Sequence, residues 1–506
     1  MESPRFTSLG RRWHRRLDSA SGGLLLFLAA FAPWGAGGTL YWSSWVLIGT
    51  GWLLGALLFA KWALVRWTGF APTFWKREGG VPVAKWPTRS LGILTGLILL
   101  QVAVSLWNYR AEVNWTSDGV DFLYRDAIEW LPTTYDVAAT RKAFFRYLAF
   151  AGVFWAMRDW LLIKSRSERH REEDGRDIED AGRVPDRLKW LGWVLSVNGA
   201  LMALVGILHR LDGAKDLLWV ISLKQMSPEG MFGSFPYRAN AAQYLNVIWP
   251  LALGMWWVLR SDALRPMSKP TRTGSQAYPM LLLCVALMVA GVFVAASRGG
   301  IGVTLVEMAL AMLVLGRAMK GWQPRLGMAL AFLSALGLGW GLAGDFLAKR
   351  FTNSLVDETM SGRTEIFEIA RRMTADFPVW GSGAESFLTL NGLYRVRALD
   401  KWHGYVHDDW LETQVTFGWV GLAVVVLMLA MTTSAKWASG RVPIHRELTW
   451  LLAIGLVGML GHAFGDFPFQ MPALHVSFLI GAALFSVLGA PPQTNAVPGS
   501  QPRGSR

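Results

Sequence analysis

The sequence predicts an all-α polytopic membrane protein with about twelve transmembrane helices and a large outer loop between helices nine and ten. Of its 506 residues, 52% are hydrophobic and 28 are tryptophan, a composition that soluble domains rarely have. A hydrocarbon core about 30 Å thick is crossed by about 20 helical residues, and apolar stretches of about that length recur along the chain. These stretches are 21–38, 43–65, 90–108, 143–163, 188–208, 241–259, 278–297, 299–319, 325–344, 417–435, 448–465 and 471–489.

The first apolar stretch and the cysteine content bear on processing, disulfides and metal binding. The first apolar stretch continues into the second without a small-residue cleavage motif, so we expect no cleavable signal peptide. The single cysteine, Cys284, lies inside a predicted span. The sequence therefore predicts neither a disulfide framework nor a thiolate metal site.

The net charge of +14 follows from membrane topology and predicts no nucleic-acid partner. If the segment RFTSLGRRWHRR is cytoplasmic, every short loop on its side of the membrane is basic, as the positive-inside rule requires. We therefore predict that both termini are cytoplasmic and that residues 345–416 lie outside. The basic side chains of the cytoplasmic loops include Lys61, Arg66, Arg260, Arg265, Arg317, Lys320, Lys436 and Arg441.

Three polar segments are predicted on the cytoplasmic side. Residues 1–20 form a basic N-terminus, 164–187 a solvated mixed-charge linker, and 490–506 a disordered tail. We expect neither the linker nor the tail to carry chemistry.

Arg298 stands in an unusual place, inside the apolar segment VFVAASRGGIGVTLVEMALAML. A charge at the centre of a span costs between about 2.5 and 17 kcal/mol. In the predicted topology SRGG is instead a tight turn at the outer face, and we expect Gly299 and Gly300 to supply the backbone freedom for it. Arg298 then lies near the outer membrane surface.

The large outer loop, 345–416, is predicted to contain ordered structure. SGRTEIFEIARRMTADFP is typical of an amphipathic helix that is capped by Ser361 and ended by Pro378. A second short helix, in WHGYVHDDWLETQVTFGWVG, leads into the tenth span. The apolar face of the first helix comprises Ile366, Ile369, Ala370 and Met373.

Three arginines at the outer ends of spans or in outer loops are candidates for binding phosphate. Arg238, Arg298 and Arg363 carry the planar guanidinium that suits bidentate phosphate binding. The alternative for each is an interfacial arginine that reaches toward lipid headgroups.

His407 is the candidate general base, because histidine titrates close to neutral pH. His403 and His407 have the i, i+4 spacing of a zinc pair if their segment is helical. No glutamate as in H-E-x-x-H and no third ligand accompany them, so we expect no metal. Asp408, Asp409 and Glu412 are near enough in sequence to orient or polarise His407. His462 and Asp466 in GHAFGDFPFQ belong to another outer turn. The alternative for His403 and His407 is that they are surface histidines. The alternative for GHAFGDFPFQ is that it is only a proline-rich turn.

Two absences exclude common classes of protein. The sequence has no P-loop, which excludes an ATP-driven pump, and no D-x-D motif for a nucleotide-sugar donor. The donor for an outer site must arrive already energised and membrane-borne.

The motifs together resemble those of the O-antigen ligase family, which shares its core with Wzy-type polysaccharide polymerases and protein O-oligosaccharyltransferases. The resemblance rests on ASRGG, SGRTEIFEIARRMTADFPVWGSGAESF, HDDWLETQVTFGWVGL, FGSFPYRANAAQYLNVIWPLALG and GDFPFQMPALHVSFLIGAAL. It covers residues 230–489, whereas 21–229 match only in hydropathy. The upstream element departs from the family pattern: YRAN retains Arg238 and Asn240 but not the first asparagine. Asp408 also stands where asparagine is usual.

The resemblance implies a GT-C-like inner-membrane enzyme that catalyses metal-independent, inverting glycosyl transfer without a cofactor in lipopolysaccharide or other surface-polysaccharide biosynthesis. The donor would be a glycan on undecaprenyl pyrophosphate, with the active site on the periplasmic side. Arg298, helped by Arg238 and Arg363, would bind the pyrophosphate, and His407 would take the proton of the acceptor hydroxyl. Asn240, Asp408, His403, His462 and Asp466 would support them.

Other functions remain open at this point. A transporter or flippase would also have about twelve helices, but it requires polar sites at mid-membrane and paired repeats. A scaffold whose outer loops dock partners is a further alternative. Within the family, the acceptor could be lipid A-core, a growing polysaccharide or a protein hydroxyl.

Overall fold

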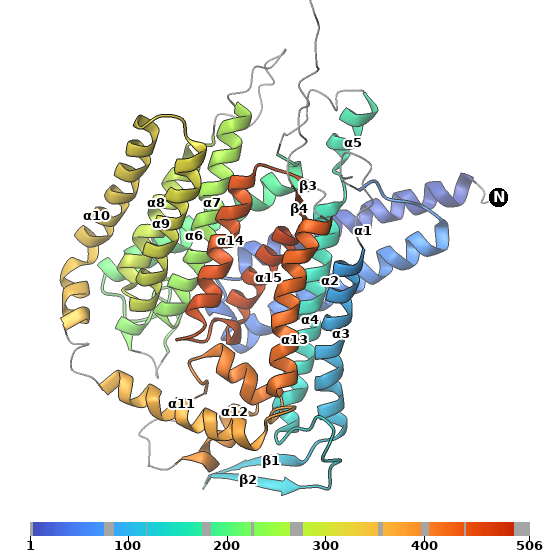
Figure 1. Cartoon of the computed structure of the whole chain (residues 1–506), viewed down its shortest axis with the longest axis vertical. Helices are drawn as coiled ribbons and strands as arrows, with labels where there is room; N and C mark the ends of the chain where they lie inside the picture. Colours follow the sequence, from blue (N-terminus) through green and yellow to red (C-terminus); the bar gives the residue numbers. More distant parts are fainter. Residues whose placement is uncertain are drawn as a thin grey trace, which may run out of the picture.

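The computed structural model describes residues 4–74, 85–117, 119–174, 184–223, 227–263, 277–352, 358–395, 404–439 and 442–489. Of the described residues, 75% are helical, which agrees with the predicted class (Figure 1). The long helices are α1 (Pro4–Phe31), α2 (Tyr41–Thr68), α3 (Trp86–Trp107), α4 (Val137–Leu162), α6 (Asp186–Leu211), α7 (Arg238–Ala263), α8 (Met280–Ala295), α9 (Arg298–Ala318), α10 (Gln323–Thr352), α13 (Asp409–Ser439), α14 (Arg446–His462) and α15 (Pro472–Val487).

The remaining elements are short. The helices are α5 (Arg166–Glu173), α11 (Glu358–Asp376) and α12 (Phe387–Leu390), with 3-10 turns η1 (Ala36–Gly38), η2 (Pro228–Gly230), η4 (Asn391–Tyr394) and η5 (Pro468–Gln470). Strand β1 (Ala111–Thr116) pairs antiparallel with β2 (Gly119–Tyr124). Strand β3 (Val442–Pro443) pairs in parallel with β4 (Leu488–Gly489).

Every predicted span overlaps one of the long helices. By length and hydropathy, 6 of the described helices can cross a membrane. α8 and α15 are apolar but shorter. A polytopic membrane protein is therefore supported, and about twelve crossings stay a prediction. The six helices are α2, α3, α6, α9, α10 (over Gln323–Leu342) and α13 (over Asp409–Lys436).

The structure corrects two predictions in the N-terminal half of the chain, the bounds of the first span and the absence of structure in the charged linker. The first predicted span, 21–38, is not one helix, because α1 starts at Pro4, ends at Phe31 and is followed by η1. The basic N-terminus is thus continuous with α1. Part of the predicted solvated linker is ordered as α5, because Ser165 and Glu168 form a capping box and Glu168 is buried. The predicted disordered tail, 490–506, lies outside the described residues.

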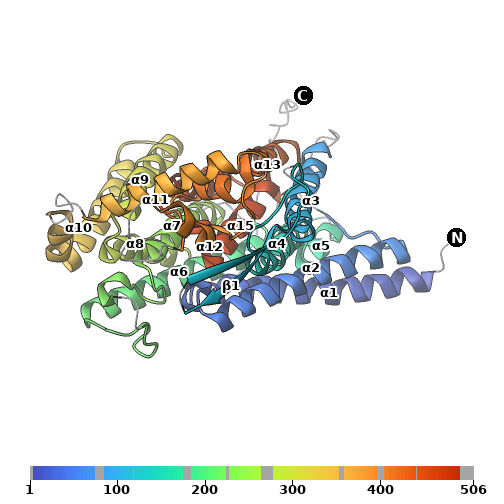
Figure 2. The same cartoon turned by 90° about the horizontal axis from the view of Figure 1, so that it is seen from below.

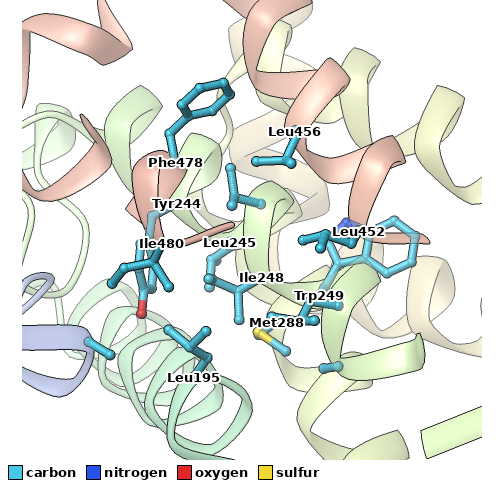
Figure 3. Packing of buried hydrophobic residues seen from close by; sticks show 14 of the residues in the cluster. Leu195, Tyr244, Leu245, Ile248, Trp249, Met288, Leu452, Leu456, Phe478 and Ile480 are labelled. Carbon is cyan, nitrogen blue, oxygen red and sulfur yellow. The ribbon is translucent and has the colours of Figure 1, made fainter. Parts of the chain in front are cut away.

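Helix α7 lies at the centre of the bundle. Nearly all of its residues from Ala239 to Leu259 are buried, so its sequence shows no apolar stripe. Polar residues such as Asn246 also pack inside: the Asn246 amide donates to the Gly300 carbonyl at 2.9 Å. Figure 3 shows Tyr244, Leu245, Ile248 and Trp249 of α7 together with Leu195 of α6, Met288 of α8, Leu452 and Leu456 of α14, and Phe478 and Ile480 of α15.

The predicted outer elements gather at one end of the bundle, which we call the loop end. Figure 1 shows α11, α12 and the β1–β2 hairpin at this end, with α5, β3 and β4 at the other. Figure 2 looks onto the loop end, where α1 and α2 lie along one edge and α10 lies far from α3.

Two helices of the loop end form as the sequence predicts. Ile366, Ile369, Ala370 and Met373 of α11 are buried in a small core with Phe387, Leu390, Val406 and Val415. The predicted N-cap is wrong, however, because α11 starts at Glu358 and Ser361 lies inside it. The second short helix is the first part of α13, which is interrupted at Gly418 by non-helical backbone (φ 66°, ψ −169°).

Candidate functional site

A tight turn carries Arg298, as predicted. α8 ends at Ala295 and α9 begins at Arg298. Ala296 has left-handed backbone, with φ 51°, and the Ser297 hydroxyl caps α9 by accepting a hydrogen bond from the Gly300 amide at 3.2 Å. The change of chain direction therefore takes place at Ala296.

Gly299 and Gly300 permit close packing of helices. Neither has the positive φ that a turn would require, so the expectation that they supply conformational freedom is wrong. A Cβ atom at Gly299 would lie 2.6 Å from Nε2 of His462, and one at Gly300 would lie 2.5 Å from Cβ of Ala242. The two glycines let α9 approach α14 and α7 closely.

Arg298 and the end of α9 concentrate positive charge. The Arg298 side chain is half-buried, and within the described part of the chain it has no hydrogen bond or ion pair. The N-terminus of a helix is already positive, which makes this an unfavourable position for a cation unless an anion is nearby. A guanidinium beside free helix N–H groups is an arrangement that binds anions.

His407 lies beside a buried carboxylate. Its Nδ1 is 3.7 Å from Oδ1 of Asp466, and that oxygen accepts a hydrogen bond from the Phe467 amide at 3.0 Å. Asp466 is 3% exposed, so water screens it little. His407 has φ 60°, a conformation that costs a non-glycine residue roughly 1–2 kcal/mol. Strain of this kind is commonly held at functional sites.

An aromatic stack joins three segments around the same histidine. The ring of Phe467 stacks on Tyr405 at 4.8 Å and on Tyr237 at 5.6 Å between centroids. The imidazole of His407 meets the Phe467 ring edge-to-face at 4.6 Å. Tyr237 precedes Arg238, so the stack places the start of α7 next to the segment that carries His407.

The residues 462–467, which we call the outer turn, connect most of the predicted site. Gly299, the residue after Arg298, packs against His462 of this turn, and the imidazole of His407 lies beside its Asp466. Nη1 of Arg363 donates to its Gly465 carbonyl at 3.1 Å. These contacts place His407 and Arg363, together with the start of α9 that carries Arg298, against a single turn.

Arg238 adjoins the same region through Tyr237, and its Nη1 donates to the Glu229 carbonyl at 2.9 Å. Asn240, in the first turn of α7, is buried, and its Oδ1 has no hydrogen-bond partner among the described residues. Gln243, one turn further, is likewise buried without partners there for its amide. Gln243 was not predicted from the sequence as a site residue, although a polar residue inside a predicted span is a signal for a functional site.

Asp408 caps α13. Its Oδ1 accepts hydrogen bonds from the Trp410 and Leu411 amides, both at 3.0 Å. Burial raises the pKa of Asp408, and these two hydrogen bonds act in the opposite direction. The carboxylate next to the imidazole of His407 is therefore that of Asp466, whereas the carboxylate of Asp408 caps α13.

The zinc spacing of the two histidines is not realised on a helix. Residues 404–408, which include His407, are not helical, and His403 lies outside the described residues. Among the described residues, no group of three or more His, Cys, Asp or Glu side chains is placed to hold a metal ion.

A cavity of about 250 Å³ adjoins the outer turn between α3, α4, α13 and α15. Its polar end contains Glu385, Asp409, Glu412, Gln470 and His475. Asp409 links it to the outer turn, because the Asp409 amide donates to the Ala463 carbonyl at 2.9 Å.

Asp409 and Glu412 of this polar end were predicted near His407, whereas Glu385, Gln470 and His475 were not predicted from the sequence. Glu385 pairs with Arg146 of α4, a charge inside the predicted span 143–163. Nδ1 of His475 lies 3.1 Å from the Phe469 carbonyl. Charged residues inside apolar stretches were a signal that could have found Arg146.

A comparison with known families gives a match over part of the chain. Residues 283–426 match a family model described as O-antigen ligase. The matched segment runs from α8 through Arg298, α11 and His407 into α13, whereas Arg238 and the outer turn lie beyond it. A comparison with curated proteins finds no match.

Proposed function

The chain belongs to the O-antigen ligase family, whose model matches residues 283–426, and on this premise we propose that it is an inner-membrane glycosyltransferase. It transfers a glycan from undecaprenyl pyrophosphate to an acceptor hydroxyl at the periplasmic face. The observation that carries the proposal is the position of the outer turn, which contacts His407 and Arg363 and packs against Gly299, the residue after Arg298.

Arg298 is the residue proposed to bind the donor pyrophosphate. Its guanidinium has no partner among the described residues and lies at the positive end of α9, which supports an anionic ligand. Arg363 and Arg238 are proposed to help, although each already donates one hydrogen bond to a backbone carbonyl. An arginine retains further N–H donors after one such bond.

His407 is proposed to act as the general base. The acceptor oxygen attacks the anomeric carbon, the bond from that carbon to the pyrophosphate oxygen breaks, and the hydroxyl proton passes to Nε2 of His407. Single displacement inverts the anomeric configuration. Asp466 is a positioning residue: its carboxylate, 3.7 Å from Nδ1, favours the tautomer that carries hydrogen on Nδ1. The distance exceeds that of a hydrogen bond, and such contacts often tighten when substrate binds.

The first test uses donor binding and transfer by purified variants. Arg298→Ala should weaken binding of a lipid-pyrophosphate glycan and lower transfer, because the developing charge on the leaving group loses its cation. Arg317→Ala, at the exposed opposite end of α9, is the matched control and should behave as wild type. Normal binding and transfer by Arg298→Ala would refute the assignment.

The second test concerns Asp466. Asp466→Asn removes the negative charge beside His407, so the imidazolium that forms during transfer should be less stable. We expect a lower turnover, with little change in donor binding. In the pH–rate profile, the limb that the general base controls should shift to lower pH. An unchanged pH profile would show that Asp466 only supports the fold of the outer turn.

The acceptor distinguishes a ligase from a polymerase or a protein O-oligosaccharyltransferase. We propose the ligase activity, and product analysis of a deletion strain tests it. Loss of polysaccharide from lipid A-core supports a ligase, shortened chains indicate a polymerase, and unglycosylated protein indicates a protein O-oligosaccharyltransferase. Unchanged surface glycans would refute all three.

A further inference from the structure

Polar side chains form a line along the face of α7 that packs on α9. Asn246 and Trp249, three residues apart on α7, each donate a hydrogen bond to a residue of α9. Thr304 and Glu307, three residues apart on α9, face them. None of the four side chains is more than 1% exposed, and all lie inside predicted spans. Polar groups are costly in such a place, so they mark candidate functional positions.

The amide of Asn246 holds α9 at two points. Its Nδ2 donates to the Gly300 carbonyl at 2.9 Å, and its Oδ1 lies 2.7 Å from Oγ1 of Thr304. The Thr304 hydroxyl is also 2.8 Å from the Gly300 carbonyl, but it has only one hydrogen to donate. Donation to Asn246 leaves no buried amide oxygen without a partner. One side chain of α7 therefore fixes both the rotation and the depth of the start of α9.

The Gly300 carbonyl belongs to the same helical turn as Arg298. α9 begins at Arg298, and the Gly300 amide donates to the Ser297 hydroxyl at 3.2 Å. The backbone around Arg298 is thus bonded within itself through Ser297 and to α7 through Asn246. The Arg298 guanidinium has no hydrogen bond or ion pair within the described part of the chain. Its position therefore depends on the position of this turn.

A second hydrogen bond between the same two helices lies further from Arg298. Nε1 of Trp249 donates to Oε2 of Glu307 at 2.9 Å. Glu307 follows Arg298 by more than two turns of helix. Both bonds join α7 to α9, but only the one made by Asn246 reaches the turn that carries Arg298. The Trp249 bond is therefore a matched control for helix packing.

We propose that Asn246 and Thr304 are positioning residues for donor binding: they fix the first turn of α9 so that the Arg298 guanidinium meets the donor pyrophosphate. The inference rests on the proposed function, because it explains how α7 places the arginine which that function uses. Asn246 and Thr304 act on the donor only through Arg298. Their effect on donor binding therefore differs from an effect on stability alone.

Binding of a lipid-pyrophosphate glycan to the purified full chain is the first measurement. Asn246→Leu keeps the size of the side chain and removes both hydrogen bonds. We expect it to weaken donor binding about tenfold, within the range of roughly 2- to 150-fold that coupled residues show. Trp249→Phe should lower the melting temperature and leave donor binding unchanged. Equal losses of donor binding in the two variants would refute a role specific to Asn246.

Two changes at Thr304 test the hydroxyl with less disturbance of the core. Thr304→Val has the shape of threonine without its hydroxyl, so it should weaken donor binding as Asn246→Leu does, to a smaller extent. Thr304→Ser keeps the hydroxyl and should bind the donor as wild type does. Unchanged donor binding in both Thr304→Val and Asn246→Leu, with lowered melting temperatures, would show that these bonds serve only stability.

A double-mutant cycle tests whether Asn246 acts through Arg298. In an Arg298→Ala background, Asn246→Leu should weaken donor binding no further, because the side chain that it positions is absent. A loss as large as that seen with Arg298 present would refute the inference. Donor binding by Arg298→Ala as strong as that of wild type would refute the proposed role of Arg298 itself, so the two failures are distinguishable.

A thiol at position 298 reports the position of the turn without any donor. The background is Cys284→Ala, which removes the single native cysteine. In that background Arg298→Cys should react faster with a water-soluble maleimide when Asn246→Leu is added, because the turn is no longer held against α7. Addition of Trp249→Phe should leave the rate unchanged. The same rate with and without Asn246→Leu would refute the positioning role, whatever the donor measurements show.

Discussion

Replacement of Gly299 by alanine tests whether close packing of α9 on α14 sets the position of Arg298. The added Cβ would lie 2.6 Å from Nε2 of His462, whereas ordinary contact begins at 3.4 Å. The two helix ends must separate by the difference, about 0.8 Å, or the buried imidazole must rotate. Overpacking of this kind costs about 1–3 kcal/mol of stability, and a misplacement of about 1 Å can lower turnover about 10²-fold.

The expected result is therefore a loss of transfer of up to about 10²-fold, with a lower melting temperature measured by tryptophan fluorescence. Gly302→Ala is the matched control, because it lies one turn further along α9 and its Cβ would meet no atom within 4 Å. Alanine favours a helix over glycine by up to about 1 kcal/mol, so this control should be neutral or stabilising.

A double-mutant cycle identifies the contact responsible. His462→Ala removes the ring that the new methyl group would meet, so Gly299→Ala should have little further effect in that background. The reasoning is refuted if Gly299→Ala melts and transfers like Gly302→Ala. It is also refuted if the effect of Gly299→Ala is as large without the His462 ring as with it.

Four further predictions concern catalysis, stability, metals and topology. His407→Ala should lower transfer by about 10²–10⁴-fold and leave donor binding nearly intact; normal transfer would make His407 a structural residue. Because burial raises the pKa of Asp408, its contribution to stability is present at acid pH and is lost as the pH rises through that pKa. Asp408→Asn, which keeps a capping oxygen, should therefore gain melting temperature relative to wild type as the pH rises above the ordinary aspartate pKa of about 4, and a constant difference would contradict this. Transfer should persist in EDTA, and activity that returns only with Mg²⁺ or Mn²⁺ would contradict it. Reporters active only in the periplasm should work when fused after Gly383 and fail after Glu173, and the reverse result would overturn the topology.

The helical framework could be predicted from the sequence because the membrane imposes a local requirement. A span must be apolar over about 20 residues and must satisfy its own backbone hydrogen bonds, so each span is recognisable without knowledge of its neighbours. Boundaries outside the hydrocarbon layer were less predictable. α1 and α5 extend helix into charged segments, where capping by Ser165 and Glu168 outweighs the polarity of α5.

The types of residue in the site were also predictable, and their partners were not. An arginine beside a span and a histidine in an outer loop are conspicuous in the sequence, because each is costly or rare in an apolar chain. Their contacts depend on segments far apart. Sequence proximity suggested Asp408 as the partner of His407, whereas the fold places Asp466 beside the imidazole and leaves Asp408 to cap α13.

The sequence by itself determined that this is a helical membrane protein, and which basic and titratable side chains its long loop contains. Only the tertiary structure decided that the outer turn joins α9, α11 and the start of α13, and that Gly299 serves contact with His462. It also decided that Glu412 and His475 share the end of one cavity. Hydropathy acts on consecutive residues, whereas a site is assembled by packing between helices, which depends on shape across the bundle.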